Sequence, residues 1–100
     1  MAVMLIARFV GEVPELVAAY DRAHEMIMSK GGGEPSGELR HQCATDDRSL
    51  YITGVWESED HIRRRWSSDE FRSTLEAAGF PSPDTAEVSI LRLHAIEPPL

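Results

Sequence analysis

The chain of 100 residues is 42% apolar and 27% charged, which suits one globular domain and excludes a disordered or fibrous chain. Its net charge of -7 disfavours nucleic acid and anionic membranes as partners, because both bind through clustered cations. No apolar run approaches the roughly 20 residues that span a bilayer, and the single cysteine, Cys43, excludes an internal disulfide, so we expect a cytoplasmic protein.

The first elements along the chain are a strand and an amphipathic helix. Residues 4–10 form a short, mostly apolar run that is typical of a central strand. Pro14 suits a first helical turn, where its missing N–H has no intrahelical partner. Over residues 15–29, apolar residues recur at three- and four-residue steps, which predicts a helix with one buried face. The residues on this face are Leu16, Tyr20, Ala23 and Ile27. The glycine-rich residues 31–37 end this helix and form a loop.

Two strands follow, at Glu38–Thr45 and at residues 50–56, joined by a turn over residues 46–49. Strict alternation places Leu39, His41 and Cys43 on one face of the first of these strands. In the second strand, Ile52, Gly54 and Trp56 alternate with Tyr51, Thr53 and Val55.

The second half of the chain carries another helix and a last strand. Ser58 is a favourable N-cap for a helix over residues 59–78, and the run Ser67-Ser68-Asp69-Glu70 predicts a kink or a restart within it. Gly79 ends the helix, since glycine readily adopts the left-handed conformation of a helix C-terminus. Residues 87–95 alternate again and predict a final strand.

The element order βαββαβ predicts a ferredoxin-like α+β domain over residues 1–97, followed by a short tail at residues 98–100. We expect an antiparallel four-stranded sheet in the order 4-1-3-2, with both helices on one face. The other face would then expose a large apolar patch, and homodimerisation through this sheet face would cover it. The residues assigned to that face are Met4, Ile6, Tyr51, Val55, Val88 and Ile90.

This pattern resembles the dimeric α+β barrel proteins, and among them the antibiotic biosynthesis monooxygenase-like (ABM-like) domains. The resemblance covers nearly the whole chain through element order. Its most specific stretch runs from Val55-Trp56-Glu57-Ser58-Glu59-Asp60 to Ser67-Ser68-Asp69-Glu70-Phe71. It implies a family that includes cofactor-free oxygenases of electron-rich aromatic polyketides, haem-degrading enzymes, and barrels without a known reaction. In the oxygenases, a tryptophan and polar groups bind and deprotonate a phenol, and Trp56 matches that tryptophan by position.

Haem and metal chemistry are disfavoured by the residues present. Haem-degrading members of the family have an asparagine on the first strand and a haem-ligating histidine about ten residues after the tryptophan. This chain has no asparagine, and Trp66 stands ten residues after Trp56, so an axial imidazole is lacking there. His41 and Cys43 could supply two metal ligands, but a zinc site needs at least a third, and His94 is expected on the opposite edge strand. We expect no metal and no other cofactor.

A substrate pocket between sheet and helices is the candidate site. Gly54 beside Trp56 removes side-chain volume next to a large ring, which would open space there. His41 is the candidate general base, since an imidazole titrates near neutral pH. Cys43 and Trp66 are further candidates for the pocket wall. Each of these side chains can equally be a packed or hydrogen-bonded structural residue.

Tyr20 and His24 lie one turn apart on the first helix and could present a hydroxyl and an imidazole to the same pocket. The basic run at residues 63–65 is interpreted as a solvated helix face, with ion pairs to acidic residues one turn before it. Arg8 and Arg92 are assigned to the dimer face, where each would need an acidic partner.

Two functions remain open from the sequence. The first is a cofactor-free oxygenase or related enzyme acting on a small aromatic or lipophilic substrate, with Trp56 in the pocket wall and His41 as base. The alternative is a non-catalytic barrel that binds a small apolar ligand or has a structural or stress-related role. Nine arginines against one lysine indicate a GC-rich bacterial genome.

Overall fold

The computed structural model of the chain describes residues 2–30 and 36–100. It confirms the expected order of elements, with the second helix divided in two and a 3-10 turn added before the last strand. The elements are β1 (Val3–Val10), α1 (Val13–Ser29), β2 (Glu38–Thr45), β3 (Ser49–Trp56), α2 (Glu59–Trp66), α3 (Asp69–Ala78), the 3-10 helix η1 (Pro83–Thr85) and β4 (Glu87–Arg92). Most of the glycine-rich loop, residues 31–35, lies outside the described residues.

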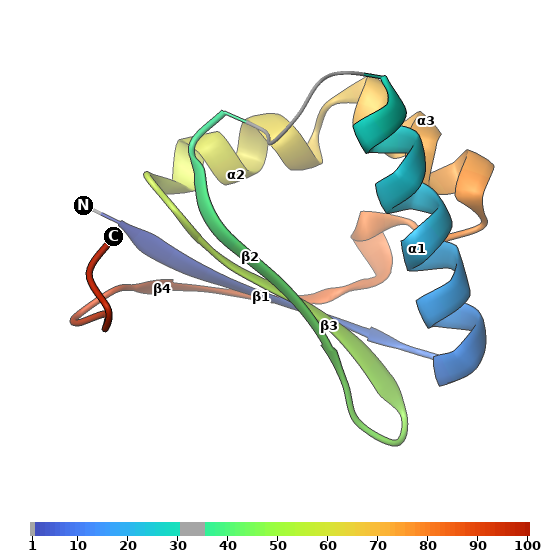
Figure 1. Cartoon of the computed structure of the whole chain (residues 1–100), viewed down its shortest axis with the longest axis horizontal. Coiled ribbons are helices and arrows are strands. Elements are labelled where there is room, and N and C mark those ends of the chain that lie inside the picture. The colour runs from blue at the N-terminus through green and yellow to red at the C-terminus, as the bar shows by residue number, and fades with distance from the viewer. Residues whose placement is uncertain (1, 31–35) are drawn as a thin grey trace.

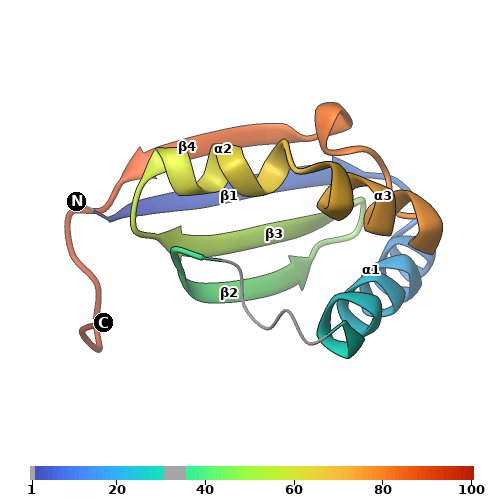
Figure 2. The same cartoon turned by 90° about the horizontal axis from the view of Figure 1, so that it is seen from above.

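The four strands form one antiparallel sheet in the order β2-β3-β1-β4, which confirms the predicted ferredoxin-like topology. Figure 1 shows α1, α2 and α3 on the same side of this sheet. The view from above in Figure 2 shows α2 lying over the strands and α1 beyond one end of them. The opposite side of the sheet carries no helix of the described chain, so one face of each strand is left without a covering layer.

The core lies between the sheet and the helices, because β1 alternates strictly between its two faces. Its inward side chains are at most 9% exposed: Val3, Leu5, Ala7 and Phe9. Phe9 packs edge-on against Phe80, with ring centroids 4.8 Å apart. Leu16, Ala19 and Ala23 are the buried residues of α1, so the helix presents the predicted stripe to the sheet with Ala19 added. Burial of this continuous apolar surface is what holds the helices on the sheet.

Local capping chemistry fixes the starts of α2 and α3 and the end of α3 as the sequence predicts. The hydroxyl of Ser58 accepts a hydrogen bond from the backbone N–H of His61 at the start of α2. The hydroxyl of Ser68 does the same for Phe71 at the start of α3, which confirms the restart. Gly79 ends α3 with φ of 79°, a left-handed conformation that a side chain would strain.

The last strand is shorter than predicted, and the face assigned to its residues was wrong. β4 ends at Arg92, so His94 lies beyond the strand. Ile90 is paired with Leu5 and Val88 with Ala7, and cross-strand partners share a face, so both point to the helix side. Arg92 is likewise paired with Val3 and is not on the open face. Alternation along a strand defines its two faces, but only the pairing decides which one meets the helices.

Arg8 does lie on the open face, and its acidic partner comes from the same chain. It is paired with Glu87 across β1 and β4, and its guanidinium donates to the Glu87 carboxylate over 3.3 Å. Among the residues that the structure describes, no helix is long and apolar enough to cross a membrane.

Candidate functional site

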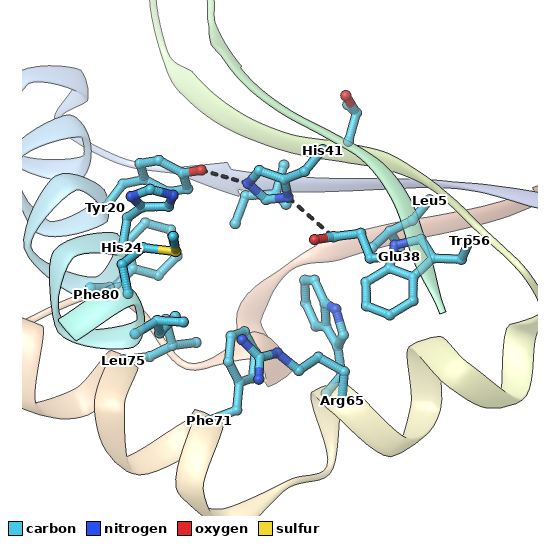
Figure 3. A pocket seen from close by; sticks show the side chains of 16 residues that line it. Leu5, Tyr20, His24, Glu38, His41, Trp56, Arg65, Phe71, Leu75 and Phe80 are labelled. Atoms are coloured by element: carbon cyan, nitrogen blue, oxygen red, sulfur yellow. Dashed lines mark hydrogen bonds and ion pairs between the residues drawn. The ribbon is translucent and has the colours of Figure 1, made fainter. Parts of the chain in front are cut away.

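A cavity of about 310 Å³ opens between the sheet, α1 and the pair α2–α3. Its size lies at the lower end of the range for pockets that hold small organic ligands. Five of its wall residues are aromatic: Tyr20, Trp56, Trp66, Phe71 and Phe80. Figure 3 shows the polar side chains of Tyr20, His41 and Glu38 along one side of the cavity and Arg65 on the side formed by α2. The cavity is therefore an aromatic chamber with a small number of polar groups.

Tyr20, His41 and Glu38 form a continuous hydrogen-bonded chain, drawn as dashed lines in Figure 3. The Tyr20 hydroxyl lies 2.5 Å from Nε2 of His41, and Nδ1 of His41 lies 3.2 Å from Oε2 of Glu38. An ionised carboxylate can only accept a hydrogen bond, so Nδ1 carries a proton and donates it to Glu38. In the neutral imidazole the Nε2 lone pair then accepts the Tyr20 O–H. This arrangement can pass a proton from the cavity to the imidazole while Glu38 stabilises the imidazolium.

Each member of this chain is positioned by a different element. Tyr20 lies on α1, one turn after Leu16, at the edge of the buried helix face. His41 lies on β2 opposite Gly54, so it points to the helix side of the sheet. Glu38 reaches the same side through an irregularity in the β2–β3 pairing between Glu38 and Arg40. The site thus joins a helix to an edge strand.

The participation of Glu38 is a difference from the sequence analysis. Strict alternation predicted Leu39 on the face of His41, but the shift in register leaves Leu39 40% exposed and turns Glu38 inward. The Glu38 side chain is only 11% exposed. A carboxylate this far removed from water needs a hydrogen-bond donor, which His41 supplies. No local signal marks such a bulge, apart from the histidine three residues later that the carboxylate contacts.

Burial raises the pKa of the Tyr20 phenol to about 12, and the nearby acidic groups Cys43, Glu38 and Asp21 add to the shift. Tyr20 therefore remains protonated at neutral pH. Its hydroxyl can transfer its proton to His41 only while it receives another proton on the same oxygen. The pKa of the Cys43 thiol is also raised, by burial and by Asp21, so this cysteine is not an activated thiolate.

Trp56 combines a buried ring with an unsatisfied donor. The residue is 2% exposed, and its ring lines the cavity. Among the described residues, its indole Nε1–H has no hydrogen-bond partner. A buried N–H without a partner is costly, so this donor is available to an acceptor that can reach it.

Gly54 serves a purpose different from the predicted one. It does not line the cavity. A Cβ atom at this position would lie 2.6 Å from the backbone oxygen of Arg40 on β2 and 3.4 Å from Nε1 of Trp56. The glycine therefore permits a close approach of the β2 backbone beside the bulge, and in this way it supports the placement of His41 and Glu38.

The remaining sequence candidates divide into two groups. His24 and Trp66 line the cavity together with Tyr20 and His41, and the His24 ring stacks on Tyr20 with centroids 6.1 Å apart. Cys43 is paired with Ile52 of β3, is exposed, and does not line the cavity. Within the described residues, no three His, Cys, Asp or Glu side chains are grouped as a metal site would require.

Arg65 was assigned to a solvated face, and the structure corrects this. Arg63 does pair with Glu59 on the outer surface of α2, but Arg65 is turned inward and lines the cavity. Its guanidinium carbon lies 4.4 Å from the centroid of the Phe71 ring. Helical periodicity places residues 63 and 65 on different sides of a helix. Because an arginine is charged, however, the sequence analysis assigned both residues to solvent and did not predict that Arg65 points inward.

No protein-family model and no curated protein sequence matches this chain, but its structure is similar to several solved ones. SnoaB, a cofactor-independent oxygenase from Streptomyces nogalater, superimposes with a TM-score of 0.67 at 20% sequence identity, over 98% of both chains. Rv0793 from Mycobacterium tuberculosis superimposes with a TM-score of 0.65 at 16% sequence identity, covering 97% of this chain and 99% of that one.

A proposed antibiotic biosynthesis monooxygenase from Caulobacter crescentus gives a TM-score of 0.63 at 16% identity, covering 96% of this chain and 91% of that one. Identities this low establish a shared fold rather than a shared reaction. The resemblance seen in the sequence is thereby confirmed at the level of structure. The chain has the ferredoxin-like α+β fold of the ABM-like proteins.

Proposed function

We propose that this protein is a cofactor-independent oxygenase of a small aromatic substrate, and that His41 accepts the substrate's acidic proton through Tyr20. The observation that carries this proposal is the chain from Tyr20 through His41 to Glu38 at the wall of an aromatic cavity. The similarity to SnoaB, itself described as a cofactor-independent oxygenase, gives independent support.

The proposed chemistry begins with removal of a proton from an acidic C–H or O–H of the bound ring. The substrate proton moves to the Tyr20 oxygen as the Tyr20 proton moves to Nε2 of His41, and Glu38 stabilises the resulting imidazolium. The indole N–H of Trp56 would donate to the substrate oxygen on which negative charge develops.

The electrons for oxygen reduction come from the substrate itself. With anthrone as the probe, the carbanion gives an electron to O₂, and the two radicals combine to form a C–O bond. The O–O bond then breaks and the second C–H proton is lost. One oxygen atom remains in the product quinone, and the other leaves as water with the two hydrogens of the original CH₂ group. His41 returns its proton to the leaving hydroxide, so the residues end in their starting state.

The test is oxygen uptake with anthrone, measured for the wild type and for His41→Gln, Tyr20→Phe and Trp56→Phe. Loss of a general base typically reduces the rate by about 10²–10⁴-fold, and we expect His41→Gln in this range. His94→Gln is the matched control, because this exposed histidine lies outside the cavity. Uptake by the wild type no faster than the uncatalysed background would contradict the proposal.

A second candidate is a binding protein without catalysis. It is favoured by one observation, namely that both ring nitrogens of His41 already have protein partners. The same assay separates the two functions. Wild-type protein that binds anthraquinone but does not accelerate oxygen uptake from anthrone would establish the binding function instead.

We also propose a homodimer in which the open faces of two sheets pack together. Met4, Ile6 and Tyr51 are only half-buried on this face, and Leu91 is 49% exposed. Sedimentation at micromolar concentration should give twice the chain mass of 11.2 kDa. Leu91→Lys should weaken the dimer, whereas Val88→Lys, an equally exposed site on the other face of β4, should not. A folded wild-type monomer would refute this assembly.

We propose further that the protein resides in the cytoplasm. The single cysteine, Cys43, suits a reducing compartment, since the chain can form no internal disulfide. Cell fractionation followed by immunoblotting would test it.

A further inference from the structure

Arg65 is the one arginine among the described residues that lines the cavity. It lies in the last turn of α2, and its guanidinium group is stacked over the ring of Phe71. Figure 3 shows it on the α2 side of the cavity, while Tyr20 of α1 and His41 and Glu38 of β2 lie across the cavity from it. A ligand in the cavity would therefore lie between a fixed cation and the proton-accepting chain.

The guanidinium of Arg65 forms no ion pair within residues 2–30 and 36–100, although the charges of Glu38 and Glu70 act on it from a longer distance. Other arginines of the chain do: Arg8 pairs with Glu87, Arg63 with Glu59, and Arg72 with Asp84. Burial lowers the pKa of Arg65, although a guanidinium remains charged at neutral pH. Arg65 is thus a half-buried cation that is held by an aromatic ring and forms no ion pair, with Glu38 and Glu70 acting on it only from a longer distance. Such a cation is suited to receive an anion from outside the protein.

The chemistry of the cavity points to the kind of anion. Its wall is mainly aromatic, so the body of the ligand is flat and apolar. A guanidinium offers parallel N–H donors that match the two oxygens of a carboxylate. The chain as a whole carries a net charge of -7 and repels anions, so a local cation is needed to admit one.

We propose that Arg65 makes the cavity selective for aromatic carboxylic acids, which it holds through the carboxylate while the ring lies between Phe71 and the wall formed by Tyr20 and Trp56. The inference rests on the proposed use of the cavity for an aromatic substrate, but it concerns binding and needs no reaction. It deepens the proposed function by naming the substrate class.

The test is a comparison of 2-naphthoate with 2-naphthamide, a neutral ligand of nearly equal shape, in titration calorimetry. We expect the wild type to bind the carboxylate at least about tenfold more tightly than the amide. Arg65→Gln should abolish this preference and change the affinity for the amide by less than about threefold. Arg65→Lys, which keeps the charge but not the planar donor pair, should retain part of the preference.

Arg64→Gln is the matched control, because the neighbouring Arg64 is exposed and donates to a backbone oxygen of its own helix. It should bind both ligands as the wild type does. Equal affinity of the wild type for the two ligands would overturn the inference. An equal loss of affinity for both ligands in Arg65→Gln, with an intact fold by circular dichroism, would also overturn it. A charge-dependent preference without oxygen uptake would support the inference while removing the oxygenase proposal. Oxygen uptake without such a preference would support the oxygenase proposal and overturn the inference about Arg65.

Discussion

Replacement of Gly54 by alanine tests how closely β2 and β3 approach beside the site. Gly54 is paired with Leu5 on β1 and with His41 on β2, in the buried part of the sheet. An added Cβ would lie 2.6 Å from the backbone oxygen of Arg40, and folded proteins essentially never contain so short a contact. The obstacle is backbone, so it cannot be relieved by rotation of a side chain. The β2 strand must move away.

The magnitude follows from two opposing effects. Overfilling a packed position typically costs about 1–3 kcal/mol. Alanine also restricts the unfolded chain more than glycine, which returns about 0.4–1 kcal/mol. We therefore expect Gly54→Ala to lower the free energy of unfolding by about 1–2 kcal/mol. For a domain of this length each kcal/mol changes Tm by about 4–8 °C, so the midpoint should fall by roughly 5–15 °C.

Thermal unfolding followed by circular dichroism at 222 nm measures this change, and Gly11→Ala provides the control. A Cβ at Gly11 would meet only the end of the flexible Leu16 side chain, at 3.3 Å. We expect this control to change stability by less than about 0.5 kcal/mol. A Gly54→Ala protein that unfolds at or above the wild-type temperature would show that the β2 backbone is not held close to β3, and the account of the bulge would fail.

Three further predictions concern single groups. Ser68→Ala removes the cap of α3 and should cost about 1 kcal/mol in urea unfolding; an unchanged midpoint would mean that the hydroxyl does not cap. The Arg72 guanidinium lowers the pKa of Asp84, so this pair stabilises the fold above the carboxyl's unfolded pKa and ceases to do so as the pH falls through the folded one. Asp84→Asn should therefore have a lower Tm than the wild type at neutral pH, and the difference should disappear once the pH has fallen below the folded pKa of Asp84; a difference independent of pH would refute this. The absorbance titration of the wild type minus Tyr20→Phe should show one phenol with a midpoint of about 12, and a midpoint at the ordinary value of about 10 would show that Tyr20 is not desolvated.

The local sequence was sufficient for the order of the elements and for several helix ends, although it predicted the last strand too long and missed the 3-10 helix. Ser58, Ser68 and Gly79 act on backbone groups within a few residues of themselves, so their effect can be read without a tertiary structure. The apolar stripe of α1 and the alternation along β1 also depend only on the periodicity of helix and strand. From these elements alone the ferredoxin-like order of strands could be predicted.

The candidate site could be predicted only in part. His41, Tyr20, His24, Trp56 and Trp66 were all candidates from the sequence, and the structure places all five on one cavity. Their residue types carry the signal, because imidazole, phenol and indole groups suit proton transfer and aromatic binding.

What the tertiary structure decided is which side of each element faces the cavity. A single shift in the pairing of β2 turned Glu38 inward and Leu39 outward, and the pairing of β4 with β1 brought Val88 and Ile90 to the helix side. Arg65 was brought to the cavity by the packing of α2 against the sheet. Periodicity along the chain fixes which residues share a face, but the direction of that face depends on contacts between residues far apart in sequence.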